Sequence, residues 1–297
     1  MAESSIATTR SGVRNPEADL GPRHAGGATQ WWILALLVTA VALTLFPFLL
    51  AAMNAVKSPT DYGANGPLGL PRSFDLSALF TFWAGVDFGR KLFNSALISV
   101  VVAVVAVALS LLNAYAIGIG KIRGRNWILI LFLMGVMVPQ ESLVYPIYYL
   151  FKSVGLYDTK TSVIIVFAVL QSAFGTYLLS AVMTAFPREI IEAAQMDGAN
   201  KFQVLWHVVI PVLRPTLMVL GTFFFIWTWN EFLLPLVLLI SNDNQTVSVA
   251  MGTLRGQYTS DPTTSAAAAL LGIVPTVLFF LVFQRSLMRG ITVGAIK

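Results

Sequence analysis

The chain has 297 residues, of which 57% are hydrophobic and only 11% are charged. Soluble domains carry about a quarter charged residues, so this composition excludes an ordinary water-soluble protein as well as a disordered or collagen-like one. The formal net charge of +5 comes from 19 basic residues spread along the whole chain, which is too dilute for a nucleic-acid-binding stripe. The sequence contains no cysteine, which excludes a disulfide framework, a thiol nucleophile and a cysteine-based metal site.

Six long apolar segments follow one another along the chain, at residues 31–53, 93–118, 127–150, 162–186, 215–240 and 265–284. A helix needs about 20 residues to cross a hydrocarbon core about 30 Å thick, and each segment reaches that length. Backbone amides in lipid must be satisfied within their own segment, and the apolar runs do not alternate with polar residues, so helices are predicted rather than barrel strands. The predicted fold class is an all-α integral membrane protein with six transmembrane helices, preceded by a disordered polar tail at residues 1–30.

The distribution of lysine and arginine predicts the orientation in the membrane. More of these residues lie on the cytoplasmic side if both termini are cytoplasmic, and the loop 119–126 alone holds Lys121, Arg123 and Arg125. The pair Arg90 and Lys91 falls on the outer side and is a counter-example. The count nevertheless favours cytoplasmic termini, which makes the loop 187–214 cytoplasmic.

The loop 187–214 has the pattern of two short helices lying outside the bilayer. Pro187 suits a first helical turn, Gly198 is a helix stop, and Asn200 can cap a second helix. The second helix carries an apolar stripe at i, i+3, i+4 and i+7, formed by Phe202, Leu205, Trp206 and Val209. Pro211 is expected to end this helix and Pro215 to open the fifth span. On physical grounds alone, an amphipathic hairpin resting on the membrane or on its own bundle explains the pattern equally well.

The same loop resembles the EAA loop of ATP-binding-cassette (ABC) importer permeases. The resemblance rests on Glu192, Ala193, Ala194, Asp197, Gly198, Ala199, Ile210, Pro211 and Pro215. Val208 and Ile210 stand where isoleucine and leucine are usual, and both changes are conservative. Three further stretches, at residues 138–156, 229–236 and 289–297, are similar to the carbohydrate-uptake, maltose-type branch of that family.

The resemblance implies a type I ABC importer permease fold in a bacterial cytoplasmic membrane. Residues 31–92 would form the first span and an extracytoplasmic loop, residues 93–284 the permease core, and residues 285–297 a cytoplasmic tail. The implied partners are a second homologous permease, a cytoplasmic ABC ATPase dimer and an extracytoplasmic solute-binding protein that delivers a sugar. Glu192, Ala193, Ala194, Asp197, Gly198 and Pro211 would belong to the ATPase-coupling element, with Glu192 paired to a basic residue of the ATPase.

Polar side chains inside the apolar segments are costly and are therefore candidates for a substrate pathway. Glu141, Tyr145 and Tyr148 share one face of the third segment, since they are spaced at i, i+4 and i+7. A second group consists of Trp227, Asn230 and Glu231 in the fifth segment, and Gln171 in the fourth is a lone candidate. Hydrogen bonding between helices, or to carbonyls freed by proline, is the alternative explanation for all of them.

The sequence gives no sign of catalytic chemistry of its own. Its two histidines, His24 and His207, lack metal-ligand spacing, and it has no phosphate-binding loop, so no metal or cofactor is expected. The chain is expected to be a transporter subunit rather than an enzyme, with ATP hydrolysis on a separate chain. A self-contained secondary transporter is the main alternative, and it predicts inverted repeats and broken helices, which the sequence pattern does not show. A membrane enzyme would need a catalytic cluster that the sequence lacks.

Overall fold

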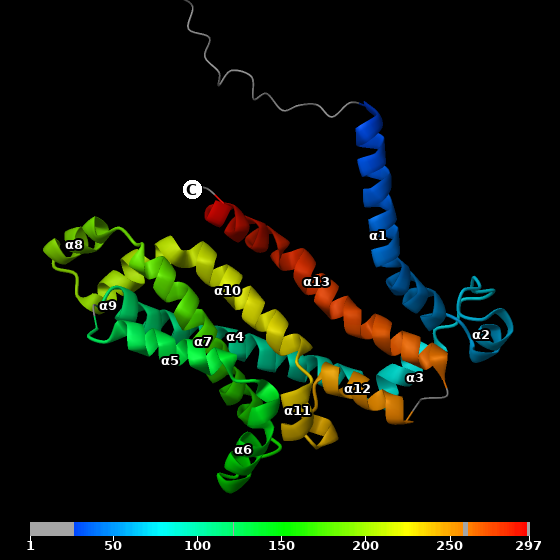
Figure 1. Cartoon of the computed structure of the whole chain (residues 1–297). Helices are drawn as coiled ribbons and strands as arrows, with labels where there is room; N and C mark the ends of the chain where they lie inside the picture. Colours follow the sequence, from blue (N-terminus) through cyan, green and yellow to red (C-terminus); the bar gives the residue numbers. More distant parts are fainter. Residues whose placement is uncertain (1–26, 121, 258–260, 296–297) are drawn as a thin grey trace, which may run out of the picture. The chain divides into compact units, whose positions relative to one another are not determined.

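The computed structural model describes residues 27–120, 122–257 and 261–295, and every regular element in these ranges is a helix (Figure 1). The tail predicted to be disordered, at residues 1–30, lies almost wholly outside the described residues. The chain divides into two compact units, Met1–Leu49 and Leu50–Lys297. Within the described residues, five helices are long and apolar enough to span a membrane, or six if one bent pair counts as a span. The all-α fold class is therefore confirmed.

The described part of the first unit is the greater part of helix α1 (Gly27–Ala55). Its spanning stretch, Gln30–Ala55, has a mean hydropathy of 2.6, and none of its most apolar window is buried within the chain. A helix that is apolar on all sides and lacks a buried face is suited to a lipid environment or to another membrane chain. The first predicted span is confirmed.

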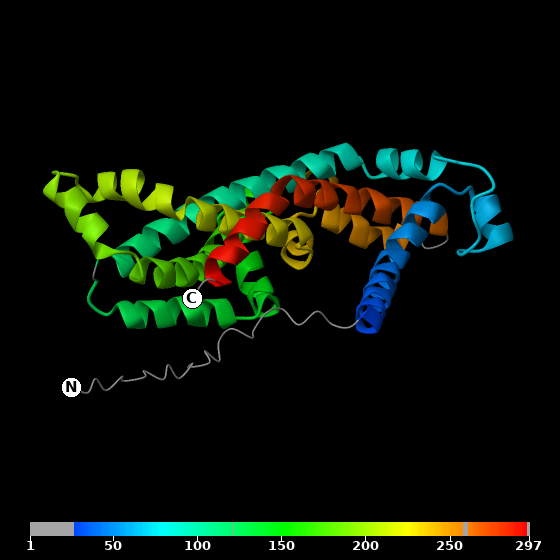
Figure 2. The same ribbon diagram turned by 90° about the horizontal axis from the view of Figure 1, so that it is seen from above.

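The second unit is built on α4 (Phe88–Gly118), which packs along α7 (Lys160–Thr184) and α10 (Ile210–Asn230), as Figures 1 and 2 show. Close approach of α4 and α7 depends on Gly175, because a Cβ atom there would lie 2.2 Å from the Ser110 hydroxyl oxygen. Small residues at membrane helix contacts allow such close backbone packing. The largest buried cluster joins these helices through Ala106, Leu111, Leu179, Met183, Leu213, Leu220 and Phe224.

Four further helices lie around this scaffold: α2 (Pro59–Asn65), α3 (Ser77–Gly85), α12 (Val247–Gln257) and α13 (Pro262–Ala295). Helix α13 packs against α3, α10 and α12. It continues as a helix through Ala295, so the predicted cytoplasmic tail at residues 285–297 is helical over most of its length.

The third apolar segment is not one helix, and the prediction of a continuous span at 127–150 is wrong. The structure has α5 (Arg125–Met137) and α6 (Gln140–Ser153), whose axes meet at 93°. Val138 and Pro139 between them are extended, with ψ of 120° and 134°. A residue that precedes proline is pushed out of the helical region, which explains the break at Val138.

The boundaries predicted around the fifth span are also wrong. The loop helices α8 (Arg188–Met196) and α9 (Lys201–Val204) are present, but α9 continues through the π-helical turn η2 (Leu205–Val209) directly into α10. The Ile210 amide donates to the Leu205 carbonyl five residues back. Pro211 follows directly after this π-helical turn, and the helix continues through it to Asn230, so Pro211 does not end the helix.

The fifth span also ends earlier than predicted. Helix α10 stops at Asn230, and the short helix α11 (Leu233–Leu238) follows after a break at Glu231, whose backbone is extended with ψ of 134°. Helix α11 packs on α6 and α7 rather than continuing along α10. The chain then passes through a short turn, η3 (Asn242–Asn244), to α12.

Candidate functional site

The hairpin α8–α9 is held in shape by its own backbone. Gly198 has a φ of 85°, which non-glycine residues rarely adopt. The Ala199 amide donates to the Ala194 carbonyl, and the Gly198 amide to the Gln195 carbonyl, which is the Schellman pattern of a helix C-terminus. Asn200 then begins α9 with a capping box in which it and Gln203 each accept from the other's amide, at 2.9 and 2.8 Å. The predicted helix stop and helix cap are confirmed.

The polar side of this hairpin faces outward. Glu192, Ala193, Asp197 and Gly198 are exposed at its surface, and Ala194 is half-buried. Ile191, which is 7% exposed, anchors α8 to the large buried cluster. Tyr115 near the end of α4 donates to the Lys201 carbonyl at 2.8 Å and fixes the hairpin to the bundle.

The apolar stripe predicted for the second helix divides into two pairs. Leu205 and Val209 are 4% and 0% exposed and belong to the large buried cluster. Phe202 and Trp206 are 68% and 59% exposed, and their rings stack with centroids 6.3 Å apart. The hairpin therefore presents an aromatic pair as well as a carboxylate-bearing helix to its surroundings.

A cavity of about 450 Å³ lies where α5, α7 and α10 meet. It brings together four of the predicted pathway residues, Gln171, Trp227, Asn230 and Glu231, from separate apolar segments of the chain. The remaining lining residues are Gly135, Val136, Val138, Gln140, Phe167, Leu170, Phe174 and Ile226. Gln140 is a polar lining residue that the sequence analysis missed, because it becomes a wall of the cavity only through the break before α6.

The most buried polar group of the cavity is Gln171, whose residue is 6% exposed. Its Nε2 donates to the Thr228 hydroxyl at 2.8 Å, while its Oε1 is buried and has no hydrogen-bond partner among the described residues. A buried unpaired acceptor costs about 1–3 kcal/mol, so a donor from a bound molecule would be favourable here. Trp227, 45% exposed, meets Phe174 edge to face with centroids 5.2 Å apart.

Glu231 links the cavity to α11. Its Oε1 accepts from the Leu233 amide at 3.3 Å, which caps the first turn of that short helix. Asn230 donates to the Ile226 carbonyl at 2.8 Å. Both residues line the cavity. Asn230 is also the last residue of α10, and Glu231 also holds the first residue of α11.

The other predicted pathway group lies elsewhere. Glu141, Tyr145 and Tyr148 keep their common helix, but that helix is α6, and none of the three lines the cavity. Glu141 lies in the first turn of α6 rather than in the middle of a straight span, and it is exposed, as is Tyr145. Tyr148 packs edge to face against Tyr157, with centroids 5.0 Å apart.

Known proteins resemble this chain over most of its length. The trehalose transport system permease protein SugB of Mycobacterium tuberculosis is 32% identical over 91% of this chain and 98% of its own. The arabinooligosaccharides transport system permease protein AraQ of Halalkalibacterium halodurans is 29% identical over 90% and 96%. A solved bacterial ABC transporter chain involved in import of the acidic polysaccharide alginate superposes with a TM-score of 0.76, covering 89% of this chain and 99% of that one, at 21% identity.

That structural likeness identifies the fold as the one found in an ABC importer. Residues 114–293, which hold α5 to α12, the hairpin and the cavity, match the model of the binding-protein-dependent transport system inner membrane components. The chain belongs to the family of binding-protein-dependent transport system inner membrane components.

Proposed function

We propose that this chain is the permease subunit of an ATP-driven sugar importer and forms half of its translocation pathway. The observation that carries the proposal is the presence, in one chain, of an exposed helical hairpin and a cavity lined by amides, a carboxylate and aromatic rings. The relatives named for trehalose and for arabinooligosaccharides support a saccharide as substrate. The chain performs no bond chemistry and needs no cofactor in this role.

The hairpin α8–α9 is proposed to dock on a cytoplasmic ATPase dimer that is a separate partner. The Glu192 carboxylate is exposed and has no ion-pair partner within the described part of the chain, so it is free to meet a basic residue. A Cβ atom on Gly198 would meet nothing within 4 Å in this chain alone. The turn at Gly198 is thus free to enter a cleft of another protein, and movement of that protein would reach the bundle through Ile191 and η2.

The cavity is proposed to form part of the sugar pathway. Sugar hydroxyls can donate to the unpaired Gln171 Oε1 and to the Glu231 carboxylate, and the apolar face of a sugar ring can pack on Trp227. The face of α6 with Glu141, Tyr145 and Tyr148 would offer the same two kinds of contact outside the cavity. A second homologous permease would complete the pathway, and an extracytoplasmic binding protein would deliver the sugar.

The proposed orientation places both termini and the hairpin in the cytoplasm of a bacterial inner membrane. Asn200 on the hairpin and Phe74 in the α2–α3 loop are both exposed. In this cysteine-free chain, Asn200→Cys should react with a membrane-impermeant maleimide only in inverted vesicles, and Phe74→Cys only in intact cells. Labelling of Asn200→Cys from outside intact cells would overturn the orientation.

Transport by the reconstituted complex tests the substrate class and the pathway together. The complex of both permeases, the ATPase and the binding protein is expected to accumulate a labelled oligosaccharide in vesicles only when ATP is supplied on the side of the ATPase. Gln171→Leu should raise the sugar concentration needed for half-maximal uptake. Ser180→Ala is the matched control, because Ser180 lies on the same helix, is buried and also has an unpaired oxygen, but does not line the cavity. Equal effects of the two variants would contradict a pathway role for Gln171.

The breaks between α5 and α6 and between α10 and α11 favour a secondary transporter, since such proteins place broken helices at their substrate sites. The same reconstitution separates the two functions. Uptake by this chain without any ATPase, driven by an ion gradient, would support the secondary transporter. Loss of uptake when the ATPase is omitted supports the importer.

A further inference from the structure

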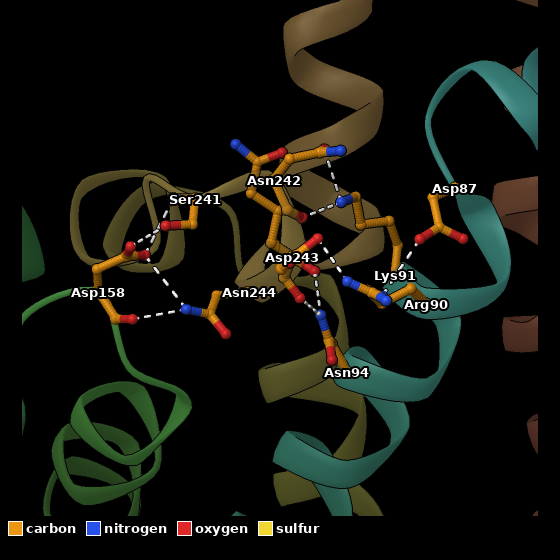
Figure 3. A network of polar contacts seen from close by, with 10 residues as sticks. Asp87, Arg90, Lys91, Asn94, Asp158, Ser241, Asn242, Asp243 and Asn244 are labelled. Carbon is orange, nitrogen blue, oxygen red and sulfur yellow. Dashed lines mark hydrogen bonds and ion pairs between the residues drawn. The ribbon is translucent and has the colours of Figure 1, made fainter.

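A network of polar side chains gathers near the start of α4, away from the hairpin contact at its other end, and Figure 3 shows its members. It surrounds the segment 241–245, which joins α11 to α12 and is called the 241–245 loop from here on. The network contacts the first turn of α4, whereas the hairpin contacts Tyr115 near the last turn. At about 1.5 Å per residue the two contacts are about 36 Å apart along α4.

From α4, two fully buried side chains hold the backbone of the loop. The Lys91 ammonium donates to the Asn242 carbonyl and, at 2.7 Å, to the Asn242 side-chain oxygen. The Asn94 amide donates to the Asp243 and Gln245 carbonyls at 2.8 and 2.9 Å. Arg90 forms ion pairs with Asp243 at 2.5 Å and with Asp87 at 3.2 Å.

From the other side, Asp158 between α6 and α7 holds the same loop. Its carboxylate accepts from the Ser241 amide at 3.0 Å and from the Ser241 hydroxyl, and its carbonyl accepts from the Asn244 amide group at 2.6 Å. The Asp158 amide donates to the carbonyl of Leu238, the last residue of α11, at 3.0 Å. The loop is therefore fixed to α4 and to the start of α7 at once.

Backbone strain is concentrated in this network. Two non-glycine residues in the described part of the chain have positive φ, Asp87 at 51° and Asp158 at 59°, and both belong to it. Such conformations persist where the surroundings enforce them, and they gather at functional and switching sites. A fully buried lysine bonded to neutral oxygens is likewise costly to place. The network thus specifies one position of the loop at an energetic cost.

The loop in turn fixes α11, which contacts residues that line the cavity. Leu234 and Leu238 of α11 are fully buried in a cluster with Phe167, and Phe167 lines the cavity. At its other end α11 is capped by Glu231, which also lines the cavity. A displacement of the loop would therefore move α11 away from the cavity wall and shift Glu231.

We infer that Lys91, Asn94 and Asp158 are positioning residues, which hold α11 and through it Glu231 and Phe167 in the arrangement that shapes the cavity. None of the three lines the cavity itself. The importance of this arrangement for sugar passage rests on the proposed function, whereas the position of α11 can be measured without any sugar or ATP.

The test compares two buried lysines with the same kind of partners. Lys57, like Lys91, is fully buried and donates to one asparagine side-chain oxygen and one backbone carbonyl, those of Asn54 and Gly66, at 2.8 and 3.0 Å. Its hydrogen bonds do not reach the 241–245 loop. Lys91→Met should release α11, and Lys57→Met, the matched control, should not.

The readout is maleimide labelling of single cysteines in the assembled complex in membranes. Leu238→Cys reports on α11, and Leu179→Cys, which is also fully buried but lies in the other cluster, reports on the bundle as a whole. Lys91→Met is expected to raise the labelling rate of Leu238→Cys about tenfold, as loss of hydrogen bonds to a charged donor would allow, and to leave that of Leu179→Cys unchanged.

Three results would overturn the inference: no change at Leu238→Cys, equal increases at both reporters, or the same change with Lys57→Met. If Lys91→Met fails to reach the membrane, Asp158→Asn loosens the loop from the α7 side and is judged by the same labelling. Failure of both variants to assemble would show a folding role and would also overturn the inference. Because labelling needs no transport, a negative result here leaves the transport test of the proposed function standing.

Discussion

The hairpin α8–α9 and the 241–245 loop both join helices outside the bundle, but they are held in opposite ways. The hairpin is closed by bonds between residues three to five positions apart, at Gly198 and in the Asn200 capping box. The loop is closed by side chains 83 to 151 positions away, on α4 and before α7. The turn of the first is set by hydrogen bonds among neighbouring residues, whereas the position of the second is set by side chains distant in the sequence.

This difference suits two kinds of task. An element that must meet another protein benefits from a rigid local shape and a free surface, and Glu192 and Asp197 are exposed on the hairpin. An element that holds a helix in position, as the 241–245 loop holds α11, benefits from contacts with several helices at once.

Gly198→Val should abolish uptake while the protein still inserts in the membrane. The side chain meets open space in this chain, so the clash arises only against a docked partner. Gly124→Val is the control, because Gly124 also has a positive φ, of 80°, and open space around it. In both variants the valine must adopt a left-handed backbone conformation, which costs about 1–2 kcal/mol. Equal loss of uptake in the two variants would attribute the effect to strain and remove the docking role.

Asn94→Ala should destabilise the protein by about 2–3 kcal/mol, because two loop carbonyls lose their donor inside a buried site. The measurement is thermal unfolding in detergent. The loss should be accompanied by labelling of Leu238→Cys. A protein as stable as the wild type would show that the loop is held without Asn94 and would break the contrast with the hairpin.

The same contrast explains how much could be predicted from the sequence. The stop at Gly198 and the cap at Asn200 act on neighbouring residues, so their types and spacing were sufficient. The roles of Lys91 and Asp158 depend on partners 151 and 83 positions away, and a basic residue at the start of a span is equally compatible with a free, solvated charge.

The breaks in the apolar segments were only partly predictable, because a local signal is present but does not decide the outcome. Pro139 is a local signal for the bend before α6, yet proline is tolerated within membrane helices, as Pro47 in α1 and Pro275 in α13 show. Hydropathy alone therefore does not show which of these prolines breaks its helix. For the same reason Gln171 and Glu231 could be named from their polarity, but their meeting in one cavity required the tertiary fold.

Asn200→Ala should lower the free energy of unfolding by about 1 kcal/mol, the usual loss when a helix N-cap is removed. Because the cap serves α9 alone, we expect the hairpin to loosen without any change at Leu238→Cys. Limited proteolysis within residues 197–203 would reveal the loosening. The comparison with Asn94→Ala is direct, since both asparagines bond backbone groups but one bridges 3 positions and the other 149. If Asn200→Ala lost more stability than Asn94→Ala, the assignment of a local role to Asn200 and a long-range role to Asn94 would be wrong.

The smallest effect concerns the charge of Asp158. Burial raises the pKa of this carboxyl, but hydrogen bonds from Ser241 and Asn244 outweigh burial and hold the pKa below its ordinary value of 3.8. A carboxyl whose pKa is lower in the folded state stabilises the protein above the unfolded pKa, and this contribution is lost as the pH falls through the folded pKa. Asparagine tolerates a positive φ, so the variant Asp158→Asn tests the charge and not the backbone.

The melting temperature of the wild type should therefore exceed that of Asp158→Asn by roughly 2 °C near neutral pH, since hydrogen bonds to a half-exposed carboxylate contribute about 1 kcal/mol. The difference should stay constant down to about pH 5 and shrink below the ordinary pKa of 3.8. Thermal unfolding in detergent between about pH 3 and pH 7 measures it. A difference that grew on acidification would mean that the carboxyl is protonated in the folded loop, and the loop would then be held by Lys91 and Asn94 alone.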